Sequence, residues 1–427
     1  MPIDFELSEE QRQLQINARQ FAEQVLAPVA ETIDRSPDAW TAFTASREAF
    51  REFGRAGFTK VFIPTEFGGA GLSLLDLAIA TEELARFDVN VPTTLLGNGL
   101  ALYPIIHYGT PEQRERFLRP FSDDTEGELL GALAFTEVEG GANFDSADPK
   151  GGIQTIARLE GDEWVITGEK HYTTNGTGWN RTGCHLYTVV CRIDDALPAN
   201  EGLAVIVVEG DRPGIVVGDV YDKLGHRGVI SPRIEFDHVR VPVDNLIGQP
   251  GVQAKAIFIE AFSWTGALIG AASVGTMRAA FEHALDFGRT EKRLGTAPVI
   301  DHQNFGFMLA DAKMRIEASR YLTWKACHQF DRTGGRDQEL AIAAKIHCSE
   351  AATSVVWDCM RLVGIASYTK NFSPLERIMR DTMAFPLYDG GNLGIRRRQL
   401  HDLFREADYD PLGAAFGVEK AAIDGGR

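Results

Sequence analysis

Cysteine and positive charge are both scarce in this sequence. Its 427 residues include five cysteines, none of them in a C-x-x-C pair, and 43 lysines and arginines against 60 aspartates and glutamates, for a net charge of −17. An odd, small number of cysteines in a long chain argues against a disulfide framework, so we expect reduced thiols and a cytoplasmic protein. The acidic balance argues against general nucleic-acid binding, which needs a basic stripe, but it allows an anionic substrate in a local basic pocket.

Several chemical signatures are also missing. The sequence has no Walker-type phosphate loop, no G-x-G-x-x-G, no G-x-S-x-G and no metal-ligand spacing among its ten histidines, so we expect neither a Rossmann-type nucleotide site nor a serine hydrolase nor a metal centre. The N-terminus carries acids where a secretion signal needs bases. The longest uncharged stretch, residues 261–277, is short for a membrane span and rich in small residues. We expect it to be a buried helix, and we expect no membrane partner.

The residue patterns divide the chain into three parts. Residues 1–128 show helical periodicity and helix-start signals, such as Ser8 with Gln11 and the pair Thr110-Pro111. Residues 129–250 contain short β-rich runs separated by glycine, proline and aspartate, including a hairpin signal at residues 160–162. Residues 251–427 return to long helical patterns. This order predicts an α+β protein with a helical domain, a β-barrel or sandwich, and a helical bundle.

Three glycine-containing segments are candidates for holding a cofactor. Residues 133–143 lie at the entrance to the β part, residues 168–176 directly follow a predicted strand, and residues 385–396 lie near the end of the predicted bundle. Each mixes glycine with hydroxyl or amide donors, which can face a flat ring or a pyrophosphate. Each is weak by itself, because most glycine-rich loops are only turns.

Taken together and in this order, the segments resemble the acyl-CoA dehydrogenase superfamily. Thr136-Glu137 with Gly141 is similar to that family's T-E-P-x-x-G-S-D motif. The resemblance covers nearly the whole chain and implies that family's fold, with an N-terminal helical domain (1–128), a central β-barrel domain (129–250) and a C-terminal four-helix bundle (251–427). Other matching positions are Gly168, Lys170, Tyr172, Thr174 and Asn175 in its G-x-K-x-W-I-T-N motif, Lys223 to Gly225, Val239 to Pro242, Arg293, His302-Gln303 and Leu309 to Asp311.

The departures from the superfamily pattern indicate one branch within it. The family's glutamate base usually stands in a Y-E-G-T segment, whereas this chain has Tyr388-Asp389-Gly390-Gly391, with a carboxylate one methylene shorter. Proline is missing after Glu137, and Tyr172 stands where the family has a ring-stacking tryptophan. The stretch 387–399, in which Arg396 follows Asp389 by seven residues, is similar to the nitroalkane oxidase branch.

That resemblance implies an enzyme that uses FAD to oxidise nitroalkanes to aldehydes or ketones, releasing nitrite and hydrogen peroxide. Asp389 would abstract the α-proton, Arg396 would favour the ionised aspartate and stabilise developing negative charge, and Thr265 would contact the flavin and tune the base. Molecular oxygen is the implied electron acceptor, and a homo-oligomer, a dimer of dimers, is expected to complete the FAD site from a neighbouring subunit. Cofactor contacts are expected from Leu133, Ala134, Phe135, Thr136, Gly141, Ala142, Asn143, Tyr172, Thr173, Thr174, Arg293, His302, Gln303, Val363, Gly364, Tyr388, Gly390 and Gly391.

Other interpretations stay open at this point. By residue type alone, Asp389 is a common turn residue, Arg396 belongs to a solvated arginine run, and Thr265 is a helix hydroxyl bonded to its own backbone. For the function, the main alternative is an acyl-CoA dehydrogenase with an aspartate base. An oxygen-activating monooxygenase on the same fold and a non-catalytic scaffold that binds no flavin are the others. Glu137 is expected to be structural.

Overall fold

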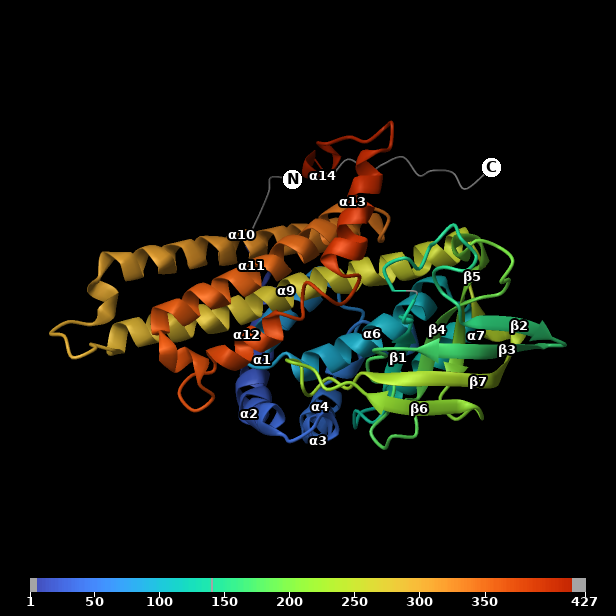
Figure 1. The fold of residues 1–427 in the computed structure, drawn as a ribbon, viewed down its shortest axis with the longest axis horizontal. Helices are drawn as coiled ribbons and strands as arrows, with labels where there is room; N and C mark the ends of the chain where they lie inside the picture. The colour runs from blue at the N-terminus through green and yellow to red at the C-terminus, as the bar shows by residue number, and fades with distance from the viewer. Residues whose placement is uncertain (1–5, 140, 417–427) are drawn as a thin grey trace.

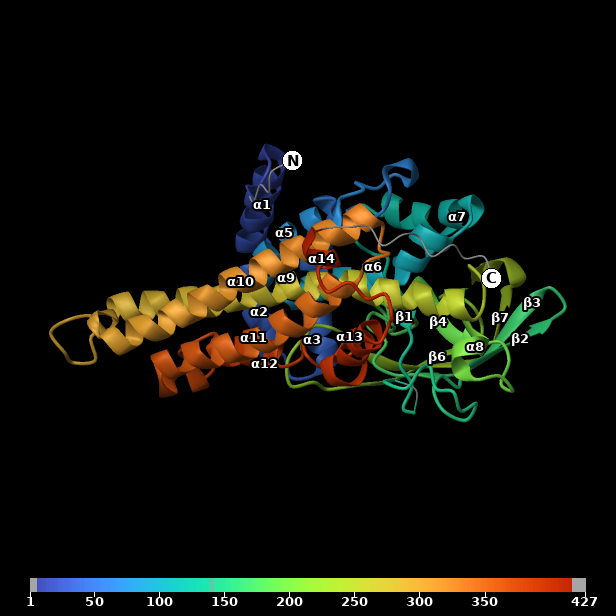
Figure 2. The same cartoon turned by 90° about the horizontal axis from the view of Figure 1, so that it is seen from above.

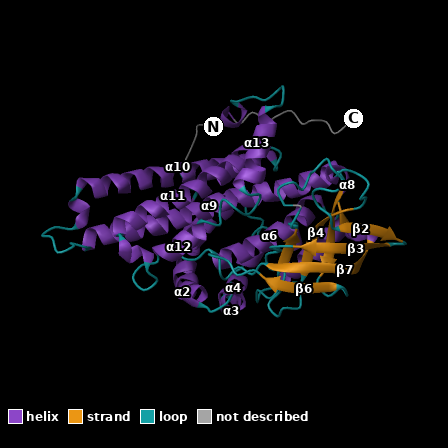
Figure 3. Cartoon of the chain, in the orientation of Figure 1, coloured by secondary structure: helices purple, strands orange, loops and turns teal. Residues whose placement is uncertain are grey.

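Along the chain, a group of helices is followed by a β-sheet and then by a second group of helices (Figure 1). The computed structural model describes residues 6–139 and 141–416. The sheet lies at one end of an elongated molecule, and three long helices extend away from it (Figure 3). The outermost residues of the predicted N- and C-terminal domains, and Gly140 within the first glycine-containing segment, lie outside the described residues.

The N-terminal part is helical, and its helices begin at the caps that the sequence predicts. Ser8 accepts a hydrogen bond from the Gln11 backbone N–H, and the Gln11 side chain accepts one from the Ser8 backbone. Thr110 and Gln113 form the same reciprocal box before Pro111. The helices are α1 (Glu9–Phe21), α2 (Ala27–Arg35), α3 (Ala39–Ala45), α4 (Arg47–Arg55), α5 (Leu74–Ala85), α6 (Asn90–Tyr108) and α7 (Pro111–Asp123), with a π-helical turn at Ala22–Leu26 and 3₁₀ turns at Phe58–Lys60 and Thr65–Phe67.

The central part is one eight-stranded mixed sheet. The hairpin signal at residues 160–162 is confirmed, because β2 and β3 pair across a turn in which Gly161 has a φ of 68°. The strands are β1 (Gly131–Ala134), β2 (Ile156–Glu160), β3 (Glu163–Lys170), β4 (Leu186–Arg192), β5 (Leu203–Glu209), β6 (Ile215–Val220), β7 (Pro232–Pro242) and β8 (Leu246–Ile247), with the short helix α8 (Ala199–Gly202) before β5 and a 3₁₀ turn at Val243–Asn245 before β8.

The sheet is not closed, so the predicted β-barrel is wrong in this respect. Its strand order is β6-β7-β3-β2-β4-β5-β8, with β1 added beside β4. Within the described residues, β6 pairs only with β7 and the two-residue β8 pairs only with β5, so the two edges do not meet. A single residue pair, Ile156 with Arg192, joins β2 to β4. The sheet therefore consists of two halves joined by a narrow seam, and helix α6 packs against β1 and β4.

The C-terminal part is a bundle of three long helices, and the short α12 (Leu375–Thr382) packs against it as the fourth. Figure 2 shows the three long helices, α9 (Val252–Thr290), α10 (Gln303–Thr333) and α11 (Glu339–Val363), running side by side. A turn in which Gly334 and Gly335 both have positive φ separates α10 from α11. The remaining elements are α13 (Arg397–Phe404), α14 (Gly413–Phe416), 3₁₀ turns at Val299–Asp301 and Ile365–Tyr368, and a π-helical turn at Asn392–Arg396.

Helix α9 contains the uncharged stretch 261–277, and the structure confirms that this stretch is buried. By length and composition α9 could cross a membrane, yet 89% of its most apolar stretch is covered by the rest of the protein. A long apolar helix covered on all sides is the pattern expected of a core helix.

A buried ionic network fixes the N-terminal helices on this bundle. Glu82 of α5 is almost fully buried and accepts hydrogen bonds from Arg278 of α9 and Arg320 of α10. Its neighbour Glu83 accepts from Arg278 and from Arg19 of α1. Because buried carboxylates are stable only with such partners, the network sets how α5 lies on α9 and α10.

Candidate active site

Asp389 occupies a strained turn between α12 and the Asn392–Arg396 turn. Its φ is 55° and that of the following Gly390 is 71°, both in the left-handed region. Aspartate tolerates this conformation better than most residues, but a non-glycine residue there still indicates a functional constraint. The turn directs the side chain inward, where only 4% of it is exposed.

The carboxylate of Asp389 has different surroundings at its two oxygens. Oδ1 accepts a hydrogen bond of 2.6 Å from the Thr265 hydroxyl on α9. That hydroxyl also lies 3.2 Å and 3.3 Å from the backbone carbonyls of Ala261 and Phe262. Thr265 is thus close both to its own helix backbone and to Asp389, and the aspartate is its nearest acceptor. Oδ2 lies 3.5 Å from Arg396 Nη2 and accepts no hydrogen bond from the described residues.

Arg396 is fully buried beside this carboxylate. Its Nε donates to the Asp389 backbone carbonyl at 3.1 Å, its Nη1 donates to Gln399 at 3.1 Å, and its Nη2 donates to the Phe262 carbonyl. The guanidinium is therefore held by neutral acceptors, and its positive charge is left to act on the carboxylate of Asp389.

The other two arginines of the run face elsewhere, as helical geometry requires. Arg397 forms two hydrogen bonds with Glu350 at the surface. Arg398 donates to Asp145, which also accepts from Lys255 of α9. The second pair ties α13 and α9 to the loop that follows β1.

Burial and charge oppose each other at Asp389. Burial raises the pKa of its carboxyl, whereas Arg396, Thr265 and Lys345 lower it, and the result is a pKa above the ordinary aspartate value. A carboxylate whose pKa is shifted toward neutrality is better matched to accept a proton from a weak acid. The geometry thus suits a general base.

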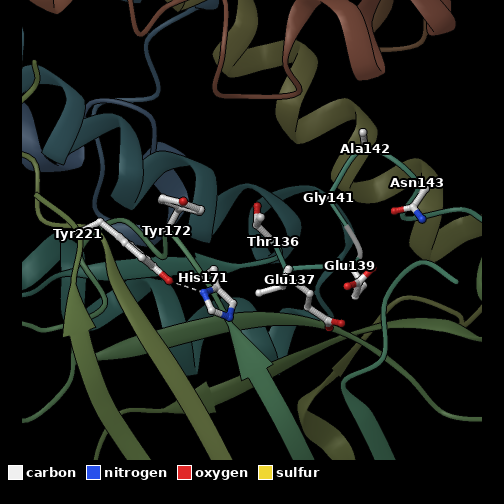
Figure 4. Close-up of a pocket in the computed structure, with 10 residues that line it drawn as sticks. Thr136, Glu137, Glu139, Gly141, Ala142, Asn143, His171, Tyr172 and Tyr221 are labelled. Atoms are coloured by element: carbon white, nitrogen blue, oxygen red, sulfur yellow. Dashed lines mark hydrogen bonds between the residues drawn. The ribbon is translucent and has the colours of Figure 1, made fainter. Parts of the chain in front are cut away.

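A cavity of about 560 Å³ lies beside the sheet, between the loop after β1 and the end of β3 (Figure 4). Tyr172 has a φ of 54° and its ring stacks on Tyr221, with centroids 4.3 Å apart and planes 25° apart. The predicted cofactor residues Thr136, Gly141, Ala142, Asn143 and Tyr172 line this cavity, together with Glu137, Val138, Glu139, His171 and Tyr221.

The cavity loop touches the turn that carries Arg396. A Cβ atom on Gly394 would lie 2.9 Å from the Cβ of Ala142, so the close approach requires a glycine at this position of the turn. The contact brings the first and third glycine-containing segments together.

Glu137 has a structural role at the edge of this cavity, as expected. It is 8% exposed and accepts hydrogen bonds from Lys170 Nζ at 2.7 Å, from the Thr155 backbone at 2.9 Å and from the Gln154 backbone at 2.6 Å. Lys170 is completely buried. The pair therefore joins the loop after β1 to the end of β3.

The remaining predicted cofactor residues fall into two separate groups. The first lies near the cavity and Asp389, on β1 and its end, after β3, and in the turn at Asp389: Leu133, Ala134, Phe135, Thr173, Thr174, Tyr388, Gly390 and Gly391. The second lies at the opposite end of α9, where the Arg293 guanidinium donates to the Val363 carbonyl at 2.7 Å and lies near Gly364. His302 and Gln303 begin α10 at that same end.

The structure does not bring these two groups together within one chain. From Thr265 to the end of α9 there are 25 residues, which at 1.5 Å per residue is about 40 Å along the helix. A single compact pocket within one chain cannot include both groups.

Two features of the site were missed from the sequence. Tyr221 reaches the cavity only because β6 and β3 both pair with β7, which brings its segment beside Tyr172. Lys345 lies near Asp389 in the core of the bundle. Its signal was available, since it is the one charged residue within the apolar run 340–346 of a predicted helix.

The sequence matches three family models along its length. They are the acyl-CoA dehydrogenase N-terminal domain over residues 8–124, the middle domain over residues 132–239 and the C-terminal domain over residues 256–402. The chain belongs to the acyl-CoA dehydrogenase family.

The relatives that the chain matches include proteins of two kinds. The nitroalkane oxidase of Fusarium oxysporum is 36% identical, with 98% of each chain covered. The mitochondrial short-chain specific acyl-CoA dehydrogenase of Mus musculus is 31% identical, covering 90% of this chain and 88% of the relative. A solved nitroalkane oxidase, an active-site mutant crystallised with 1-nitrohexane, has a TM-score of 0.91 at 34% identity, covering 97% of this chain and all of the other. Both kinds of relative are flavin-dependent oxidoreductases.

We predict that Glu137→Ala lowers the free energy of unfolding by about 3–5 kcal/mol, because it leaves the buried Lys170 ammonium without its carboxylate. Thermal and denaturant unfolding measure this change. Glu139→Ala is the matched control, since Glu139 is an exposed acid on the same loop, and we expect it to change stability by less than about 0.5 kcal/mol. Equal stability of the two variants would contradict the structural role of Glu137.

Proposed function

We propose that this member of the acyl-CoA dehydrogenase family is an FAD-dependent nitroalkane oxidase. The observation that carries the proposal is the buried Asp389 carboxylate, fixed between the Thr265 hydroxyl and the Arg396 guanidinium. The similarity of nearly the whole chain to a solved nitroalkane oxidase, crystallised with 1-nitrohexane, supports the same conclusion. A primary nitroalkane, oxygen and water would give an aldehyde, nitrous acid and hydrogen peroxide, which balances atoms and electrons.

Asp389 would begin this reaction by removing the proton next to the nitro group. Its Oδ2 is the oxygen that takes the proton, because Oδ1 already accepts from Thr265 and Oδ2 has no donor among the described residues. Once Asp389 is neutral, the negative charge lies on the substrate. The Arg396 guanidinium, buried beside Asp389, then stabilises that charge.

The residues around the cavity fit FAD. The cavity has about 560 Å³ and is lined by backbone-rich loops with an aromatic wall, and the Thr173 hydroxyl beside it is buried without a hydrogen-bond partner among the described residues. Thr136, Gly141, Asn143, Tyr172 and Thr173 are the residues that would hold the cofactor. Bound FAD would accept the electrons from the deprotonated substrate and pass them to oxygen.

The functional unit is proposed to be a homotetramer, a dimer of dimers. The predicted cofactor residues near Arg293 lie about 40 Å from the catalytic end of α9, so a second subunit is the means by which they could reach a cofactor. Phe307 and Met314 are 59% and 62% exposed on α10. Their spacing of seven residues places them on one face, and such faces mark interaction surfaces.

We predict that the FAD-loaded protein releases nitrite and peroxide from nitroethane or 1-nitropropane, and that Asp389→Asn lowers this rate by about 100- to 10,000-fold because the base is lost. Nitrite, peroxide and flavin absorbance should be followed in parallel with a short acyl-CoA as the competing substrate. Asp408→Asn, an exposed aspartate of the same C-terminal region, should behave as the wild type.

Two outcomes would contradict the proposal. Anaerobic flavin bleaching by the acyl-CoA, without nitrite release from a nitroalkane, would favour an acyl-CoA dehydrogenase with an aspartate base. A protein that takes up no FAD would favour a scaffold.

The pH dependence follows from the raised pKa of Asp389. The base works only when ionised, so kcat/KM should be high above this pKa and fall as the pH drops through it. We predict that Thr265→Val moves this fall to higher pH, because the hydroxyl that favours the ionised carboxylate is gone. At pH values below this fall, kcat/KM of Thr265→Val should be about tenfold lower than that of the wild type. Thr265→Ser, which keeps the hydroxyl, should restore the wild-type value. An unchanged pH profile in Thr265→Val would show that the hydroxyl does not act on the base.

We predict that Phe307→Asp combined with Met314→Asp breaks the tetramer, since each places a charge on the proposed apolar interface. Sedimentation velocity should show smaller species and FAD should be bound less tightly. Leu159→Asp is the control, because Leu159 is 55% exposed on β2 within the sheet. A wild-type protein that sediments as a monomer would refute the assembly.

A further inference from the structure

Lys345 is a buried lysine whose ammonium the proposed reaction does not use. It lies on α11 with none of its surface exposed. Its Nζ donates to the Asn392 side-chain carbonyl at 2.8 Å. A buried lysine is costly to a fold, so such a residue usually has a specific task.

The Lys345 side chain lies next to Arg396. A Cβ on Gly266 of α9 would lie 3.3 Å from Lys345 Cγ and 3.4 Å from Arg396 Nη2. Both cationic side chains therefore pass the same point of α9, one residue after the Thr265 that holds Asp389. Gly266 leaves the space that lets them do so.

The side chain of Asn392 is held by three residues of α11. Besides accepting from Lys345, its amide donates to Ser349 at 3.0 Å and to Glu350 at 3.1 Å. Asn392 is also the first residue of the turn that ends at Arg396. The position of Arg396 therefore depends on a contact that Lys345 makes.

We propose that Lys345 is a positioning residue of this active site, which holds the Asn392–Arg396 turn in place and adds a second buried positive charge near Asp389. The proposal rests on the proposed function, in which Asp389 is the base. Lys345 acts through Asn392 and through its charge, and the structure places no direct contact between it and the carboxylate of Asp389.

The charge of Lys345 depends on pH. Burial lowers its pKa to about 7, with Asp389 and Glu350 raising it and Arg396 lowering it. These are the charged groups that act on it, from its own helix, from the Asp389 turn and from the Asn392–Arg396 turn. The ammonium is therefore present below about pH 7 and lost above it. Below that pH the ammonium favours the ionised form of Asp389, and above that pH the neutral amine no longer does so.

The test compares Lys345→Gln, which keeps an amide donor for Asn392 but has no charge, with Lys345→Met and Lys345→Arg. In the FAD-loaded enzyme we expect the acidic fall of kcat/KM with nitroethane to move to higher pH in the Gln and Met variants. Their deficit against the wild type should reach at least tenfold at low pH and narrow above about pH 7. Lys345→Arg should keep the wild-type profile.

A purely structural role gives a different result. It would lower kcat/KM by the same factor at every pH and would leave the position of the fall unchanged, and that outcome overturns the proposal. Lys60→Met, which removes one positive charge at the Phe58–Lys60 turn of the N-terminal part, controls for net charge and should match the wild type. If Lys345→Met does not fold, the Gln variant still decides.

A second measurement keeps this proposal separate from the proposed function. The infrared band of the protonated Asp389 carboxyl, assigned by its loss in Asp389→Asn, reports the titration of Asp389 without turnover. If the wild type oxidises no nitroalkane, the proposed function fails, but the Lys345 proposal stands when Lys345→Gln shifts this titration to higher pH. An unshifted titration rejects it.

Discussion

The burial of one carboxylate is the constraint on which the rest of this structure depends. An ionised aspartate removed from water costs several kcal/mol unless charge and hydrogen bonds compensate for it. Here the compensation comes from three different elements: Thr265 of α9, Arg396 of the Asn392–Arg396 turn and Lys345 of α11. The ionised Asp389 can therefore exist only where α9, α11 and this turn meet, and its strained backbone is maintained because all three are fixed.

Helix α9 connects this constraint to the whole molecule. It carries Thr265, it packs along α11, and through Arg278 it binds the buried carboxylates of α5. Its far end reaches Arg293, well away from Asp389. A single helix thus joins the Asp389 turn to a distant group of predicted cofactor residues, and this separation is the reason for proposing that a second subunit contributes to the site.

Local signals were enough to predict much of this fold. Capping at Ser8 and Thr110 and the turn at Gly161 depend on neighbouring residues alone, and they are confirmed. Barrel closure depends on pairing between strands far apart in sequence, and the short β8 does not provide it. Asp389 and Arg396 stand seven residues apart in one segment, so the sequence alone indicates that they lie near each other. Tyr221 reaches the cavity through strand pairing that no local pattern encodes. The apolar run around Lys345 indicates a buried lysine, but not which residues it contacts.

The arrangement also explains how an acidic protein can favour an anionic intermediate. The net charge of −17 is spread over the whole chain, and charges separated by more than about 10 Å of electrolyte act weakly on one another. At Asp389 the local balance is reversed, because two buried cations, Arg396 beside the carboxylate and Lys345 near it, act on it in a medium of low polarity. When the carboxylate takes a proton from the substrate, these two cations stabilise the negative charge that then lies on the substrate. A small substrate that holds this charge on compact oxygens close to the base gains most from them, so the same two residues that make burial of Asp389 possible also favour a nitroalkane.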